Sequence, residues 1–120
     1  MDWKLDRNRA ICPQLCEQIC VAIASGEFLA GSKLPSVRDI ALMAGVNPNT
    51  VQKALEQLSS QGVVYAERGS GWFVSSTNDD AKRVKQDVIF KKTQDYINEL
   101  KTLGLELTQI KQYVKEWEDK

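Results

Sequence analysis

Histidine is absent from this sequence, which removes the commonest general base and the commonest nitrogen ligand for zinc. The 120 residues carry no net charge either, with 16 Lys and Arg against 16 Asp and Glu. No apolar run reaches the roughly 18 residues of a membrane span, and the N-terminus lacks the pattern of a secretory signal. These absences argue against an enzyme, a histidine-based metal site and a membrane protein, and we expect no cofactor.

Cysteine is scarce, and its three copies stand four residues apart at Cys12, Cys16 and Cys20. Three cysteines cannot all pair within one chain, which favours a reducing, cytoplasmic location. The spacing places all three on one stripe of a helix, beside its apolar face. Metal or redox sensing is one interpretation, but no fourth ligand type lies nearby. Packing as small hydrophobic side chains is the favoured alternative.

Turn-forming residues are confined almost entirely to the first part of the chain. All three prolines and six of the seven glycines precede residue 75, whereas the density of charged residues more than doubles after it. We therefore predict an α+β, mainly α fold with a compact domain over residues 1–75 and a helical tail over residues 76–120. The polar run at 75–80 suits a short linker or a helix N-cap.

Apolar residues recur at helical spacing in three segments of the first domain. The segment 12–25 has one apolar stripe, and 37–44 follows Ser36, a favourable N-cap. The third segment begins sharply, because Asn47 is a good N-cap and Pro48 suits the first helical position. Its expected buried stripe comprises Val51, Ala54, Leu55 and Leu58.

Two short apolar runs follow these helices, at 63–65 and 72–74, with a glycine-containing turn between them. This pattern predicts a β-hairpin. A helix, a short turn, a second helix and a hairpin together form a winged helix-turn-helix. In that fold the second helix of the pair enters the major groove of DNA.

The polar residues around these elements are the candidate DNA contacts. Asn and Gln can pair with adenine, Lys reaches guanine or phosphate, and the N-terminus of residues 37–44 offers N–H groups to a phosphate. Small or basic residues at the hairpin tip allow close approach to the backbone or minor groove. The candidate set is Ser36, Arg38, Asn47, Pro48, Asn49, Thr50, Gln52, Lys53, Arg68, Gly69 and Ser70.

Three stretches together resemble the DNA-binding domain of the GntR family of bacterial transcription regulators. They are Gly31-Ser-Lys-Leu-Pro-Ser-Val-Arg38, Gly45-Val-Asn-Pro-Asn-Thr-Val-Gln-Lys-Ala-Leu55 and Gly69-Ser-Gly-Trp-Phe-Val74. The resemblance implies a backbone-contacting role for Arg38, base or phosphate contacts at Pro48, Asn49, Thr50 and Gln52, and a wing tip at Gly69. The short tail resembles the YtrA subfamily, whose members commonly lie with transporter genes.

The tail shows two amphipathic patterns separated by Gly104. Two helices of this size cannot bury their apolar stripes on each other alone, so we expect a second copy to cover them. Folding back onto the winged domain is the alternative. The expected dimerisation residues are Val88, Ile89, Ile97, Leu100, Leu103, Leu107, Ile110, Val114 and Trp117.

These patterns favour a cytoplasmic homodimer that regulates transcription, with an inverted-repeat DNA operator and a second copy of itself as partners. Repression by occlusion of a promoter is the expected mechanism, with any effector still to be identified. Two alternatives come from other classes. One is a winged-helix protein-interaction module, which the neutral charge and Glu56 favour. The other is a drug-responsive sensor with an apolar pocket at the dimer interface.

Overall fold

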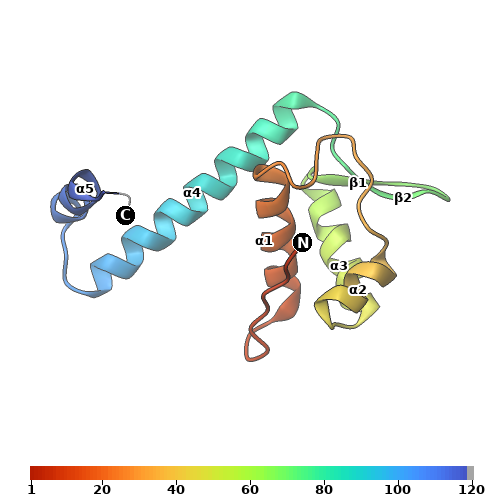
Figure 1. The fold of residues 1–120 in the computed structure, drawn as a ribbon, viewed down its shortest axis with the longest axis horizontal. Coiled ribbons are helices and arrows are strands. Elements are labelled where there is room, and N and C mark those ends of the chain that lie inside the picture. The colour runs from red at the N-terminus through yellow and green to blue at the C-terminus, as the bar shows by residue number, and fades with distance from the viewer. Residues whose placement is uncertain (119–120) are drawn as a thin grey trace. The chain divides into compact units, whose positions relative to one another are not determined.

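The computed structural model describes residues 1–118 and contains five helices and one two-stranded antiparallel sheet within them (Figure 1). By its internal contacts the chain divides into two compact units, Met1–Val88 and Ile89–Lys120. The helices are α1 (Ile11–Ala24), α2 (Val37–Ala44), α3 (Pro48–Ser60), α4 (Asn78–Thr102) and α5 (Leu107–Glu116), and the strands are β1 (Val64–Glu67) and β2 (Gly71–Val74).

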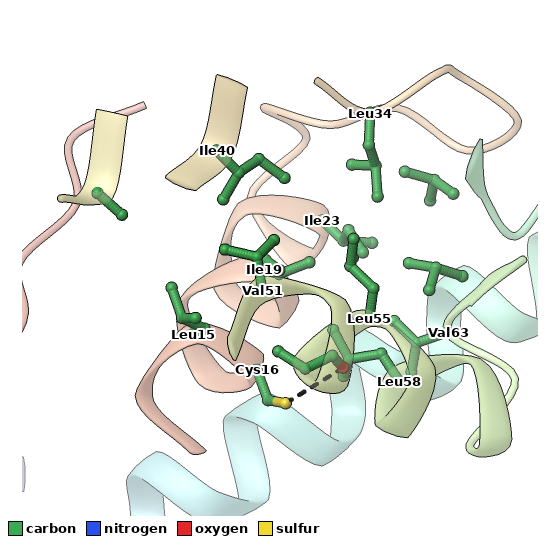
Figure 2. Close-up of a cluster of buried hydrophobic side chains, with 14 of the residues drawn as sticks. Leu15, Cys16, Ile19, Ile23, Leu34, Ile40, Val51, Leu55, Leu58 and Val63 are labelled. Atoms are coloured by element: carbon green, nitrogen blue, oxygen red, sulfur yellow. Dashed lines mark hydrogen bonds between the residues drawn. The ribbon is translucent and has the colours of Figure 1, made fainter. Parts of the chain in front are cut away.

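Helix α3 lies at the centre of the first unit, since it packs against α1, α2 and β1. The four residues predicted for its buried stripe are all at most 1% exposed. Figure 2 shows three of them, Val51, Leu55 and Leu58, in one cluster with Leu15, Ile19 and Ile23 of α1 and Ile40 of α2. The core therefore fixes one face of α3 and leaves the opposite face toward solvent.

The α2–α3 connection is the helix-turn-helix that the sequence predicts. Ser36 Oγ accepts a hydrogen bond from the Asp39 amide at 3.0 Å and caps α2, which ends at Gly45 with a left-handed φ of 69°. Only glycine adopts that conformation without strain. Asn47 Oδ1 then accepts from the Asn49 amide at 2.8 Å, so α3 begins three residues after Gly45, at Pro48.

Strands β1 and β2 form the predicted wing, with Tyr65 opposite Phe73 and Glu67 opposite Gly71. The loop before α2 adds a short third segment, because the Leu34 amide donates to Trp72 O and the Val74 amide donates to Ser32 O, both at 2.9 Å. The wing is thus tied to the start of the helix-turn-helix as well as to α3.

The polar run at 75–80 leads directly into α4. Ser75 Oγ donates to Asp80 Oδ2 at 2.7 Å, and the Asp80 amide donates to Thr77 Oγ1 at 3.1 Å. Hydrogen bonds from Thr77 and Ser75 lower the pKa of the Asp80 carboxyl. Val84 of α4 is buried in the core of the first unit, and Val88, expected at a dimer interface, packs against that same core. The compact units divide within α4, between Val88 and Ile89. The domain boundary expected at 75/76 stays a prediction.

In the second unit, α5 ends one residue earlier than the expected apolar stripe. Trp117, predicted to lie on this helix, follows it as an extended C-cap residue. Helix α5 starts with a reciprocal pair of bonds, in which the Glu106 side chain accepts from the Gln109 amide and the Gln109 side chain accepts from the Glu106 amide. No helix in the described part of the chain is long and apolar enough to cross a membrane.

Candidate nucleic-acid interface

The first turns of α3 present polar side chains to solvent. Asn49 and Lys53 are exposed, and Thr50 and Gln52 are partly exposed. Asn47 and Pro48 fix where this surface starts, because the Asn47 side chain is engaged in capping the helix. The predicted residues on α3 thus divide into two that set the helix start and four that can reach a ligand.

Gln52 has an intramolecular partner on the same face of α3. Its Nε2 donates to Glu56 Oε1 at 3.0 Å, one helical turn further along. The bond orients the Gln52 amide before any ligand arrives. Glu56 adds a carboxylate to this face, which disfavours phosphate but can accept a hydrogen bond from the amino group of cytosine. The face is therefore better suited to base edges than to the DNA backbone.

Arg38 and Ser36 lie together at the N-terminus of α2. Arg38 is the second residue of the helix and is exposed, whereas the Ser36 hydroxyl already caps the helix. The N-terminal amides and the positive end of the helix dipole favour a phosphate here. Both residues are exposed, but only Arg38 carries the positive charge that a charge-assisted contact requires.

The wing tip consists of Arg68, Gly69 and Ser70, all exposed. The Ser70 amide donates to Glu67 O at 3.0 Å and closes the turn, while Gly69 has a φ of 80°. Lys33 is a cation that sequence reasoning missed. Its backbone forms an isolated antiparallel β-bridge with Phe73 of β2, and its Cε would lie 3.3 Å from a Cβ added at Gly71. The wing therefore carries two cations, Arg68 at its tip and Lys33 at its edge.

The three cysteines lie on one side of α1, and the environments of Cys16 and Cys20 oppose the thiolate form. Cys16 is buried, and its Sγ donates to Ala54 O at 3.5 Å (Figure 2). Burial, followed by the neighbouring Cys12, raises its pKa to about 12, while burial and the carboxylates of Asp87 and Glu17 raise the pKa of Cys20 to about 11. Metal binding and nucleophilic reaction both require the thiolate. Within the described residues no group of three or more His, Cys, Asp or Glu side chains could hold a metal ion.

The raised pKa of Cys16 predicts alkaline destabilisation. Between pH 9.0, the ordinary thiol value, and about 12, the unfolded chain loses this proton while the folded chain keeps it. The free energy of unfolding must therefore fall as the pH rises through this window. Urea unfolding of the wild type and Cys16→Ala at pH 7, 9 and 10.5 measures the effect. We expect the difference between the two proteins to shrink with pH, and a constant difference would contradict this assignment.

The second unit leaves most of its large apolar side chains exposed. Ile110 of α5 is buried within the unit, but Val114 is 58% exposed and Trp117 is 70% exposed. An apolar cavity of about 640 Å³ opens between the end of α4 and α5. It is lined by Tyr96, Leu100, Leu103, Leu105, Tyr113, Val114 and Trp117. The second unit by itself therefore does not bury this surface.

The geometry of the first unit agrees with what the chain is similar to. The family profile described as "Bacterial regulatory proteins, gntR family" matches residues 13–74, from the start of α1 to the end of the wing. The chain belongs to the GntR family. It is 32% identical over 107 residues to the HTH-type transcriptional repressor YtrA of Bacillus subtilis, with 86% of this chain and 80% of that protein covered.

Solved structures of GntR proteins support the same assignment. A GntR family transcriptional regulator from Listeria monocytogenes superimposes with a TM-score of 0.84 at 31% identity, covering 95% of this chain and 100% of that one. AraR(DBD), solved in complex with operator ORX1, gives a TM-score of 0.54 at 32% identity over 59% of this chain and 87% of that one. This chain is thus a YtrA-like GntR transcriptional regulator with a DNA-binding helix-turn-helix, and its relatives are regulators rather than enzymes.

Proposed function

We propose that this GntR regulator is a cytoplasmic homodimer that represses transcription by binding an inverted-repeat operator, that of a transporter operon as its YtrA-like sequence suggests. The observation that carries the proposal is the exposed polar face of α3. Asn47 and Pro48 fix where this helix starts, and the apolar stripe on its opposite face is fully buried. Such a helix can enter the major groove without rearranging the core. Repression is inferred from YtrA, whose name describes a transcriptional repressor.

In this proposal the candidate residues have three different roles. Asn49, Gln52 and Lys53 read base edges from α3. Arg38 binds a phosphate at the N-terminus of α2, and the tip residues Arg68, Gly69 and Ser70 approach the backbone or minor groove. The segment from residue 33 to 72 has four basic and three acidic residues. Affinity for DNA therefore depends on a few well-placed contacts rather than on a broad basic surface.

The homodimer is supported by the exposed apolar surface of the second unit. A second copy would cover the side chains around the cavity, including Leu103, Val114 and Trp117. Two winged domains related by a two-fold axis would then meet two half-sites spaced by about 34–36 Å or a multiple of it. Ile110 and Val88 already have partners within one chain, so among the expected dimerisation residues these two are assigned to the fold of each unit.

The same cavity favours a second candidate function, the binding of an apolar effector. Its volume of about 640 Å³ lies in the range of small-molecule sites, and its lining includes Tyr96, Tyr113 and Trp117. Titration of the dimer with planar aromatic cations, followed by tryptophan fluorescence, tests this candidate. Quenching that is saturable and that changes the affinity for DNA would support an effector site.

Arg38→Ala tests the placement of α2 on the DNA backbone. We expect weaker binding to every duplex and a salt dependence whose slope falls by about 0.9 for each lost phosphate contact. Fluorescence anisotropy titrations at several salt concentrations give both quantities. Lys85→Ala is the matched control, because it removes the same charge from an exposed position on α4 outside the proposed interface. An unchanged slope in Arg38→Ala would remove Arg38 from the contacts.

A further inference from the structure

The first ten residues form an N-terminal arm that ends against the helix-turn-helix. Arg7 of this arm donates from Nη1 to Gly45 O at 3.0 Å and from Nη2 to Ala44 O at 2.9 Å. These two carbonyls belong to the last residue and the C-cap of α2. The final carbonyls of a helix have no partner within the helix, and the negative end of its dipole lies there. A guanidinium can donate hydrogen bonds to both carbonyls and place a positive charge at the negative end of the dipole, because it is planar, forked and always charged.

The arm is held in place by side chains of α1. Gln14 is buried, accepts from the Asp6 amide at 2.8 Å and donates to Asp6 O at 2.9 Å. One turn later, Gln18 accepts from the Lys4 amide at 3.0 Å and donates to Lys4 O. The Asp6 carboxylate also accepts from the Asn8 amide at 2.9 Å, which shapes the turn that carries Arg7. These hydrogen bonds therefore fix the backbone from which the Arg7 side chain extends to α2.

The residues that Arg7 contacts, Ala44 and Gly45, lie directly before the turn that sets where α3 begins. Gly45 reverses the chain with its positive φ, and the Val46 amide donates back to Ala41 O at 3.0 Å. Asn47 then caps α3, two residues after the carbonyl that Arg7 binds. A Cβ added at Gly45 would lie 3.1 Å from Arg7 Nη2, which shows how closely the guanidinium covers the turn.

We propose that Arg7 is a positioning residue for DNA recognition: it locks the α2–α3 turn and thereby the start of α3, without itself contacting DNA. The proposal rests on the DNA-binding function proposed above. Arg7 lies before residues 13–74, so the family match does not cover it. Because the turn carries Asn47 and the first base-reading residues follow it, a loosened turn should harm sequence discrimination more than attraction to the phosphate backbone.

The test compares Arg7→Gln with Arg9→Gln, which removes the same charge from the same arm at a position whose ion pair with Asp6 is 3.8 Å long and exposed. The probes are a duplex that the wild type enriches from a random-sequence library and a scrambled duplex of equal length. We expect Arg7→Gln to bind the enriched duplex about tenfold more weakly, with the scrambled duplex and the salt slope unchanged. Arg9→Gln should match the wild type, and Arg7→Lys should recover part of the loss.

Other results would overturn the proposal. Equal loss on both duplexes with a smaller salt slope would make Arg7 a phosphate contact. A lower thermal midpoint with unchanged discrimination would make it a stabilising residue only. If the wild type enriches no duplex, the proposed function fails, and hydrogen exchange still decides the role of Arg7: faster exchange at the Val46, Thr50 and Val51 amides in Arg7→Gln supports the lock, whereas unchanged exchange contradicts it.

Discussion

Val114→Glu is expected to convert a dimer into a monomer and to weaken binding to an inverted-repeat operator by about 10²- to 10⁴-fold. Val114 is 58% exposed in the single chain, so a charge there should cost little in the folding of one copy. Covered by a second copy, however, the same carboxylate would be buried without a partner. The loss of affinity arises because two linked winged domains bind two half-sites far better than one domain binds one.

Sedimentation equilibrium measures the mass of Val114→Glu, and anisotropy titrations measure its affinity for full and half operators. Binding to a single half-site should stay unchanged, which separates loss of dimerisation from misfolding. Thr108→Glu is the matched control, since it adds the same charge to an exposed position on a different side of α5 that does not line the cavity. A dimeric Val114→Glu with full operator affinity would reject the proposed interface.

Leu55→Ala is expected to destabilise the first unit by about 2–5 kcal/mol, because it leaves a cavity beside α3. Leu55 is 0% exposed and lies in the core that connects α3 to α1 and α2. A loss of this size is a large part of the free energy of unfolding of a small domain, so operator binding at 37 °C should decline with the folded fraction.

Leu42→Ala provides the control for Leu55→Ala with the same chemical change. Leu42 is 74% exposed on α2, and surface substitutions of this kind usually change stability by less than about 0.5 kcal/mol. Urea unfolding followed by circular dichroism gives both values. Equal effects of the two substitutions would mean that α3 is not anchored by the described core.

The elements of the first unit could be predicted because each carries a local signal. Ser36 and Asn47 are N-caps, Gly45 ends α2, and the stripe of Val51 and Leu58 has the spacing of a buried helical face. These signals act over three or four residues, so the sequence alone reveals them. The wing could be predicted equally well, because its glycine turn separates two short apolar runs.

The N-terminal arm could not be predicted, because its contacts join residues far apart in sequence. Arg7 meets Gly45 across 38 positions, and nothing near either residue indicates the pairing. Lys33 was missed for a similar reason, since only the folded loop brings it beside β2. The place of Val88 also depends on tertiary packing: its spacing fits the exposed stripe of the tail, whereas the fold uses it in the core of the first unit.

Recognition of an operator by α3 is tested most directly by titrating the wild-type protein into a fluorescent duplex from its own upstream promoter, at two salt concentrations, beside a scrambled duplex. A sequence-specific regulator should bind the promoter duplex at least about 10³-fold more tightly than the scrambled one and lose affinity as salt rises. Equal affinity for the two duplexes, or no binding at low salt, would contradict recognition of an operator by α3.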